Sequence, residues 1–216
     1  MIIGSRRYER EAPSRDARKV YIFCEGRKTE YKYFRYFFEM DSRISLNVFQ
    51  MGEEDNTTPA GVLEKAKEFY KTTGIIDIDE VWLVFDRDYD KLDSRKSQIE
   101  KVREECASLE NCRVALSNPC FEVWLYYHFF AEVPEFEGLN VSVNWKRYLA
   151  DAVLGGFDTR KHPVLIETAL ANARAVYLED ESGEPVVCST EVYKLAESIV
   201  PLVKEKLQLL HGRHNG

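Results

Sequence analysis

Two aspartates at the end of an apolar run are the residues of this chain best suited to chemistry. The run Val81 to Phe85 is apolar throughout, and Asp86 and Asp88 follow it. A short apolar run bounded by polar residues is typical of a strand buried on both faces. Residues two apart in extended backbone point to the same side, so we expect the two aspartates to hold one hard cation together. The alternative interpretation is an acidic loop without a function.

Further carboxylates follow other apolar runs of the chain. Glu25 comes directly after the run 19–24, and Glu122 comes soon after the run 112–116. In open α/β folds, ligands bind beyond the carboxyl ends of the strands, and parallel strands share that edge of the sheet. The sequence therefore predicts that Glu25, Glu122 and the aspartate pair converge there, although they lie far apart in the chain.

The chemistry that such carboxylates suit is metal-assisted hydrolysis of a phosphodiester. Oxygen ligands are typical of Mg²⁺ and Mn²⁺, and we assign the metal to Glu25, Asp86 and Asp88. Glu25 is either a ligand of a second ion or the general base. Glu122 either completes the catalytic site or is an acid that stabilises the positive end of a helix dipole. Both alternatives stay open at this point.

Basic and amide side chains close to these positions are candidate ligands of a substrate. Arg27 and Lys28 follow the first strand, Asn118 follows the fourth, and Lys161 lies in a later predicted loop. We predict that these four side chains contact substrate, the cations through charge-assisted hydrogen bonds to phosphate. Solvated surface positions are the alternative for the cations. Asn118 before Pro119 also predicts a helix N-cap, with the proline at the first helical position.

Strands and helices alternate through the first part of the chain. Apolar runs at 19–24, 46–51, 81–86 and 112–116 are each followed by a segment with the apolar spacing of a helix. Repeated strand–helix units with short connections predict an α/β fold. In that fold a parallel sheet is joined by right-handed crossovers and is flanked by helices on both faces.

The pattern divides the chain into three parts. Residues 1–18 carry several arginines and few apolar residues, which predicts a flexible basic N-terminal arm. The α/β core is expected over 19–130, and a C-terminal helical region packed on that core is expected over 131–216. Helical spacing in this last region predicts helices at about 145–154, 164–178 and 190–210, and Pro201 is expected to kink or interrupt the last of them.

Composition excludes several classes of protein. The 216 residues are 44% hydrophobic and 31% charged, which is typical of a globular chain. A net charge of −7 argues against a protein that coats nucleic acid through bulk positive charge. No apolar run approaches the ~20 residues of a membrane helix and no signal peptide is evident, so we expect a cytoplasmic protein. Five cysteines without a Cys-x-x-Cys pair predict neither a disulfide framework nor a zinc site.

Four motifs, taken in order, resemble the RloB family over about residues 19 to 205. They are Cys24-Glu25-Gly26-Arg-Lys-Thr29-Glu30, Asp86-x-Asp88, Ser117-Asn118-Pro119-Cys120-Phe121-Glu122-Val-Trp124-Leu-x-x-His128 and Ser189-Thr190-Glu-Val192-Tyr-Lys-Leu195. Their order and spacing together are more specific than any one of them. The chain departs from the commonest family form at Val187-Cys188, where the family has Asn-Pro.

This resemblance implies a Toprim-like core and a function in bacterial defence. In the Toprim fold a glutamate follows the first strand and an Asp-x-Asp follows a later one, which correspond here to Glu25, Asp86 and Asp88. RloB proteins are associated with defence loci and accompany an ABC/AAA-type ATPase. The resemblance thus implies a nuclease effector that uses Mg²⁺ or Mn²⁺, acts on tRNA, other RNA or DNA, and is controlled by that ATPase. The aromatic-rich helices leave room for a homodimer.

Two other functions are compatible with parts of the pattern. The core is a catalytically inactive regulatory subunit of the ATPase if its metal binding is vestigial, although the intact Glu25, Asp86 and Asp88 argue against this. A phosphatase with a nucleophilic aspartate also uses Asp-x-Asp, but places it after the first strand rather than the third. A primase or topoisomerase needs additional domains, for which this chain lacks room.

Overall fold

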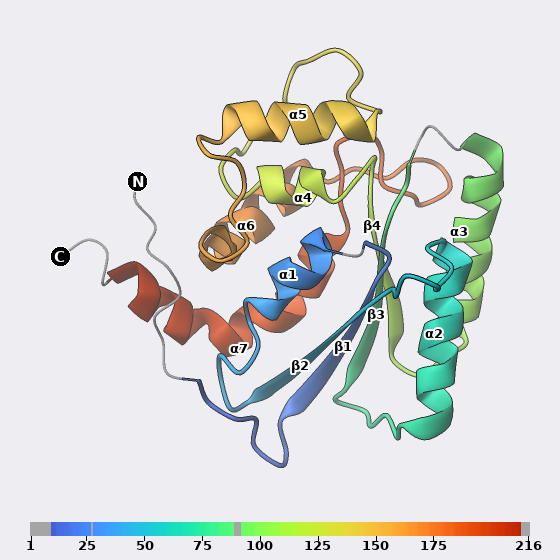
Figure 1. Ribbon diagram of the computed structural model, residues 1–216, viewed down its shortest axis with the longest axis vertical. Coiled ribbons are helices and arrows are strands. Elements are labelled where there is room, and N and C mark those ends of the chain that lie inside the picture. The colour runs from blue at the N-terminus through green and yellow to red at the C-terminus, as the bar shows by residue number, and fades with distance from the viewer. Residues whose placement is uncertain (1–9, 27, 89–91, 213–216) are drawn as a thin grey trace.

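The computed structural model describes residues 10–26, 28–88 and 92–212, and its centre is a four-stranded parallel sheet (Figure 1). In the sheet the strands have the order β2-β1-β3-β4, and each neighbouring pair is parallel. The predicted α/β fold is confirmed. The strands are β1 (Arg18–Cys24), β2 (Ile44–Gln50), β3 (Glu80–Asp86) and β4 (Cys112–Ser117).

The two central strands, β1 and β3, form the topological switch point of the sheet. The chain passes from β1 to β2 on one side of the sheet, and from β3 to β4 on the other. Ligands of open α/β sheets bind where the strand order reverses in this way. The register pairs Cys24 with Val84 and Asp86 with Ser117, which brings the carboxyl ends of β1, β3 and β4 to the same edge.

Two helices cover one face of the sheet, α2 (Pro59–Thr72) and α3 (Leu92–Ala107) (Figure 1). Thr58 is the N-cap of α2, and its Oγ1 accepts a hydrogen bond from Gly61 N at 3.2 Å. The buried side chains that these helices contribute to a shared core with the sheet are Val62, Leu63, Ala66, Ile99, Val102 and Cys106.

The other face is covered by α1 (Thr29–Arg35), α4 (Glu122–Tyr126), α6 (Ile166–Val176) and α7 (Val192–Gly212). An aromatic cluster lies between α1 and α4. The Tyr33 ring contacts the rings of Trp124 and His128 edge-on. Tyr33 Oη lies 3.0 Å from His128 Nε2, and burial lowers the pKa of His128 to about 3. His128 is therefore a neutral packing residue of this cluster.

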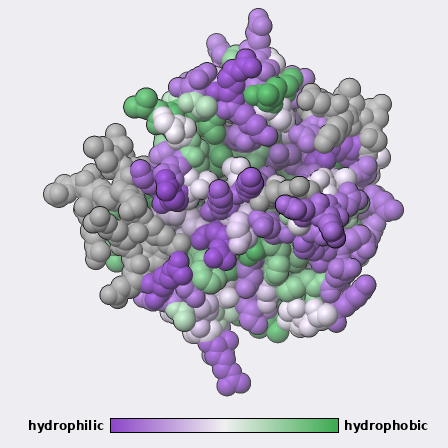
Figure 2. Space-filling view, in the orientation of Figure 1, coloured by the Kyte–Doolittle hydropathy of each residue, from purple (hydrophilic) through white to green (hydrophobic). Residues whose placement is uncertain are grey.

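Helix α5 (Ser142–Ala152) lies against α4, on the side away from the strands (Figure 1). Its Trp145 and Leu149 are buried, and Trp145 Nε1 donates to Leu139 O at 2.6 Å. A short 3₁₀ helix, η2 (His162–Leu165), leads into α6. Hydrophilic residues cover much of the molecular face in Figure 2, with small apolar groups between them.

Two features of the helices differ from the prediction. Helix α4 begins at Glu122 rather than directly after Asn118, and the Asn118–Pro119 peptide bond is cis. Pro201 does not interrupt α7, because it lies on the exposed side of the helix, where water can reach the carbonyl that it leaves unpaired. Among the described residues, no helix has both the length and the apolar content to cross a membrane.

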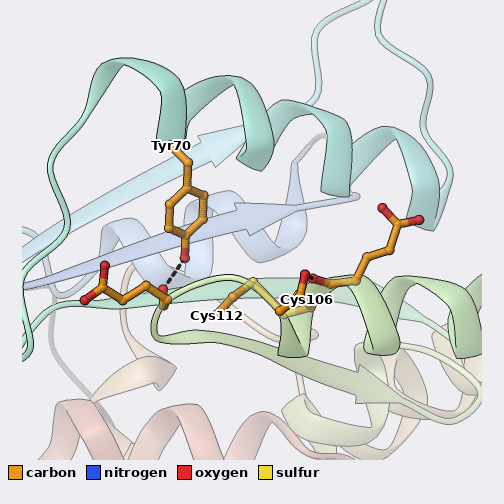
Figure 3. The surroundings of a disulfide bond; sticks show 6 residues. Tyr70, Cys106 and Cys112 are labelled. Atoms are coloured by element: carbon orange, nitrogen blue, oxygen red, sulfur yellow. Dashed lines mark hydrogen bonds between the residues drawn. A yellow bond between two sulfur atoms is a disulfide. The ribbon is translucent and has the colours of Figure 1, made fainter.

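The expectation of a chain without disulfides is wrong for one pair of cysteines. Cys106, near the end of α3, is bonded to Cys112, at the start of β4, with a Cα–Cα distance of 5.4 Å (Figure 3). The connection from α3 to β4 folds back on itself, so two residues six apart meet. Cys24, Cys120 and Cys188 are free and buried, as expected of small apolar residues.

The predicted N-terminal arm is described only from residue 10 onward, because residues 1–9 lie outside the described part of the chain. Glu11 N donates to Glu39 O at 3.0 Å, and the Glu11 carboxylate pairs with Lys206 of α7. Ala17 is buried, and Arg18 is already the first residue of β1. The second half of the arm therefore lies against the body of the protein.

Candidate active site at the carboxyl edge of the sheet

Glu25 and Asp86 stand at the ends of the two central strands. Glu25 N donates to Val84 O at 2.9 Å, which continues the pairing of β1 with β3 by one residue. The Glu25 carboxylate then reaches the end of β3, where its Oε2 lies 3.3 Å from Asp86 N and accepts a hydrogen bond from it. The sheet topology thus brings together two residues that are 61 positions apart.

Arg95 of α3 joins these two residues from the α3 face of the sheet. Its Nη2 donates to Glu25 Oε2 at 2.6 Å and to Asp86 O at 2.6 Å, and its Nε donates to Asp86 O at 3.0 Å. The Arg95 side chain is almost fully buried. Because a buried cation needs a partner of opposite charge, this guanidinium and the Glu25 carboxylate stabilise each other.

Asp88 does not continue the extended backbone of β3. Its φ is +45°, in the left-handed region, and Asp88 N donates to Pro119 O at 3.0 Å. The Asp88 carboxylate accepts a hydrogen bond from Ser142 Oγ of α5 at 3.0 Å. The expectation that Asp86 and Asp88 share one side of an extended strand is therefore wrong, because the strand ends at Asp86 and the chain turns there.

Glu30, in the first turn of α1, is a buried carboxylate at the same edge. The pKa of Glu30 is raised to about 7, chiefly by burial and also by the charges of Glu122 and Glu25, while a backbone hydrogen bond and the charge of Lys146 lower it. The Glu30 carboxylate lies directly over Gly26, where an added Cβ would come within 1.9 Å of Glu30 Oε2. The Glu30 carboxylate can lie there because residue 26 has no Cβ.

Glu122 faces this edge from the first turn of α4. Its charge raises the pKa of Asp86, of Glu30 and of the buried Cys120 thiol. It is also the main cause of a raised pKa at Lys146 of α5. Glu122 is therefore close to the other carboxylates, while its position in the first helical turn also suits a helix-dipole acid. Both of the interpretations drawn from the sequence fit this position.

Asp86 lies at the centre of the resulting concentration of negative charge. Burial raises its pKa well above the usual range of aspartate, and four neighbouring carboxylates raise it further. Like charges that crowd together in a partly dry site disfavour ionisation, and a bound cation reverses that effect. We call these five residues the acidic cluster: Glu25, Glu30, Asp86, Asp88 and Glu122.

The donor chemistry of the acidic cluster suits a hard divalent cation. All five side chains offer carboxylate oxygens, the ligand type of Mg²⁺ and Mn²⁺. Within the described ranges, however, no group of three Asp, Glu, His or Cys side chains is arranged to hold a metal ion. Glu25 is turned to Arg95, and Asp88 is turned to Ser142. The metal assigned to Glu25, Asp86 and Asp88 therefore stays a prediction, and its binding requires side-chain rotation.

The four predicted substrate ligands have different surroundings. Arg27 lies outside the described residues. Lys28 is exposed at the N-cap position of α1, next to the acidic cluster in sequence. Asn118 is 3% exposed, and its Nδ2 donates to Pro185 O at 2.7 Å, so its placement gives no support to a role in substrate binding. Lys161 lies 3.8 Å from Asp158 in the loop before η2.

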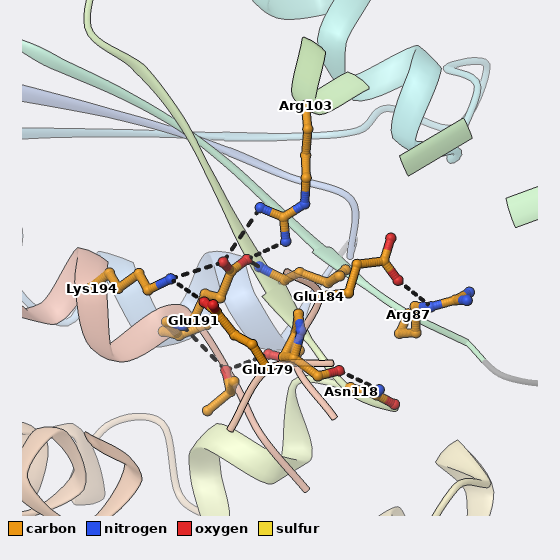
Figure 4. Close-up of polar contacts among 12 residues, drawn as sticks. Arg87, Arg103, Asn118, Glu179, Glu184, Glu191 and Lys194 are labelled. Carbon is orange, nitrogen blue, oxygen red and sulfur yellow. Dashed lines mark hydrogen bonds and ion pairs between the residues drawn. The ribbon is translucent and has the colours of Figure 1, made fainter. Parts of the chain in front are cut away.

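A second polar network holds a C-terminal segment against the end of β4 (Figure 4). Glu191 Oε2 accepts hydrogen bonds from Arg103 Nη2 at 2.6 Å and from Leu116 N at 3.1 Å, and Glu191 Oε1 pairs with Lys194 at 3.1 Å. Arg87, between the two aspartates in sequence, pairs with Glu184 at 3.1 Å. The acidic cluster is thus tied directly to the C-terminal region.

Sequence reasoning missed three side chains at this edge: Glu30, Arg95 and Lys146. A signal for Glu30 was present, because it is an acid in the first turn of the helix that follows Gly26. Arg95 and Lys146 come from helices in which charged residues are frequent, and nothing in their local sequence distinguishes them from their neighbours. Their roles depend on how α3 and α5 pack.

The family model of the RloB-like protein matches residues 20–199. The match includes every member of the acidic cluster, all four strands apart from the first residues of β1, and most of the C-terminal helices. No match was found among curated proteins or among solved structures.

Proposed function

The chain belongs to the family of RloB-like proteins, and from this membership and the acidic cluster we propose that it is a metal-dependent nuclease. The observation that carries the proposal is the convergence of Glu25, Glu30, Asp86 and Glu122 at the switch point of a parallel sheet. A site with so many carboxylates is unfavourable in isolation and suits a divalent cation and a phosphodiester substrate.

Each residue of the cluster has a proposed role. Asp86 and Asp88 hold Mg²⁺ or Mn²⁺, and Glu25 is either a further ligand or the general base. When bound, the cation neutralises charge on the phosphate and lowers the pKa of water. Glu122 completes the site from the start of α4. Arg95 keeps the Glu25 carboxylate at the end of β3 through its contacts at 2.6 Å, and so positions it.

The biological setting that we propose rests on the family resemblance. RloB proteins accompany an ABC/AAA-type ATPase in bacterial defence loci, so we propose this ATPase as the partner and a defence function for the nuclease. RNA, including tRNA, and DNA are both candidate substrates, because neither the carboxylates nor the fold distinguishes them.

A catalytically inactive subunit of the same ATPase is the second candidate. The observation that favours it is the pairing of Glu25 with Arg95, which occupies a predicted metal ligand with a protein cation. The absence of a preformed ligand set in the described part of the chain points the same way. Against it, a cluster of acids that no longer binds a cation is costly to keep.

A cleavage assay separates the two candidates. Purified protein is incubated with total tRNA, single-stranded RNA and plasmid DNA, each with Mg²⁺, with Mn²⁺ and with a chelator. We expect metal-dependent cleavage of one substrate class, and its loss in Asp86→Asn and Asp88→Asn. Glu100→Gln, which changes an exposed acid of α3, is the matched control and retains activity. No cleavage of any substrate, with the triggered ATPase present, would favour the inactive subunit.

A further inference from the structure

We propose that Lys146 of α5 binds a phosphate of the nucleic acid substrate at the acidic cluster. The inference rests on the proposed function and names a substrate ligand that the C-terminal helical region supplies. The cluster alone repels a polyanion, so a substrate needs at least one cation of the protein that is free to meet its backbone.

The position of Lys146 follows from the packing of α5. At the start of the helix, Ser142 Oγ donates to Asp88 Oδ1 at 3.0 Å, and Ser142 O lies 3.9 Å from Cys120 Sγ. Residues four apart lie on the same side of a helix, so Lys146 is one turn beyond Ser142 and on its side. The buried Trp145 and Leu149 fix the rotation of α5. The Lys146 ammonium therefore faces the carboxylates from across the sheet edge.

Two other cations close to the cluster are already paired with acids. Arg95 is buried against Glu25, and Arg87 is paired with Glu184. Lys146, in contrast, is exposed, and it forms no ion pair with any residue that the structure describes. The charges of Glu122, Asp86 and Asp88 raise its pKa, as is expected of an ammonium close to these carboxylates. It is therefore a cation held close to the acids but open to a ligand.

Arg147 provides a matched control because it is the next residue and is equally exposed. Its side chain lines a separate cavity with Phe136 and Tyr148, and none of the acidic cluster lines that cavity. Removal of Arg147 changes the net charge as much as removal of Lys146 does. A nonspecific effect of charge is therefore the same in both variants, whereas the loss of a phosphate contact is confined to Lys146.

The test measures binding and cleavage in Lys146→Ala, Lys146→Arg and Arg147→Ala. Fluorescence anisotropy gives the Kd of a short labelled single-stranded RNA and of a short DNA duplex over a salt series, with Ca²⁺ in place of Mg²⁺. We expect Lys146→Ala to raise Kd about tenfold, as the loss of one charge-assisted hydrogen bond does. The slope of log Kd against log salt should fall by about 0.7 for RNA or 0.9 for duplex DNA. Lys146→Arg should keep the slope, and Arg147→Ala should keep both values.

The outcomes separate this inference from the proposed nuclease function. If the wild type cleaves and Lys146→Ala has the same Kd and salt slope as the wild type, the inference is overturned and the proposed nuclease function is unaffected. If Lys146→Ala lowers the slope of log Kd against log salt but the wild type does not cleave, the phosphate contact is supported and the proposed nuclease function is contradicted. Equal effects of Lys146→Ala and Arg147→Ala, or no binding by the wild type, would overturn the inference.

Discussion

Glu30 is the residue on which the geometry of the acidic cluster depends most directly. It is buried, it lies over a glycine, and its pKa is raised to about 7. Each of these properties has a consequence that a single substitution can measure. The two predictions at the scale of the residue therefore concern Glu30 and the glycine beneath it.

Gly26→Ala should destabilise the protein and disturb the cluster. A Cβ at position 26 would come within 1.9 Å of Glu30 Oε2, so the carboxylate at the end of this flexible side chain has to move. We expect a loss of about 1 kcal/mol in the free energy of unfolding, at the lower end of the cost of overpacking. Urea denaturation measures it. Gly74→Ala is the control, because nothing lies within 4 Å of its added Cβ. Equal free energies of unfolding in the two variants would show that the Glu30 carboxylate does not lie over residue 26.

Stability in the absence of divalent cations should fall as the pH rises from about 4.5 to about 7. The pKa of Glu30 is raised from 4.5 in the unfolded chain to about 7, so the folded state binds the additional proton within this window. The contribution of this proton is present at low pH and is lost as the pH passes through the folded pKa. We expect a loss of at most roughly 3 kcal/mol.

The Glu30→Gln variant tests that assignment. Glutamine has the shape of the protonated acid and does not titrate, so the variant should lose this part of the pH dependence and be more stable than the wild type at pH 8. Denaturation curves at several pH values, with a chelator present, give the comparison. A variant with the same pH dependence as the wild type would assign the titration to another member of the cluster.

At this scale the sequence predicts those site residues that directly follow strands. Glu25 and Asp86 continue apolar runs, and a parallel sheet places both at one edge. The geometry of Asp88 was not predictable, because its left-handed backbone depends on a hydrogen bond to Pro119 from a distant segment. Arg95 and Lys146 were not predictable either, since many charged residues on α3 and α5 are equivalent until the helices pack.

Among the elements, the segment before α7 is connected to three others. The carboxylate of Glu191 is buried and links α3 through Arg103, β4 through Leu116 N and α7 through Lys194. Removal of this carboxylate leaves Leu116 N without its side-chain acceptor and leaves two cations, which are 28% and 33% exposed, without this partner. Glu191→Ala should therefore lower the free energy of unfolding by about 1–3 kcal/mol.

Thermal or urea unfolding measures this loss, with Glu181→Ala as the control. Glu181 is an exposed acid in the same segment of the chain, and its removal should change stability by less than about 0.5 kcal/mol. A similar small effect of Glu191→Ala would mean that the three elements are held together by apolar packing alone.

Local sequence predicts the strands better than the start of α4. The runs that become the central strands β1 and β3 are almost uninterrupted because burial on both faces requires apolar residues, whereas the edge strand β2 alternates buried with half-buried residues at its start. Asn118 and Pro119 have the chemistry of a helix start, but the chain does not turn into a helix there. Asn118 N donates to Ser189 O at 3.0 Å and Asn118 O accepts from Cys188 N at 2.8 Å, so pairing with a distant segment overrides the local preference.

For the molecule as a whole, a divalent cation should act as a stabiliser. A ligand that binds only the folded state adds about 2.7 kcal/mol at one hundred times its Kd. For a chain of this length that corresponds to an increase in Tm of roughly 5–10 °C. We expect such an increase with Mn²⁺ or Mg²⁺ in the wild type and in Glu100→Gln, and its absence in Asp86→Asn. An equal increase in Asp86→Asn would place the cation elsewhere.

The pairing of residues 188–191 with the end of β4 has a consequence for biosynthesis. Ser117 and Thr190 form an antiparallel bridge, and Glu191 N donates to Leu116 O at 2.8 Å. The strands and their carboxylates are translated long before this segment leaves the ribosome. The edge of the sheet that bears the acidic cluster is therefore completed only after residues 188–191 have been synthesised. A nascent chain that still lacks these residues would carry the acids without their final arrangement, which delays any activity of the cluster until this segment has been made.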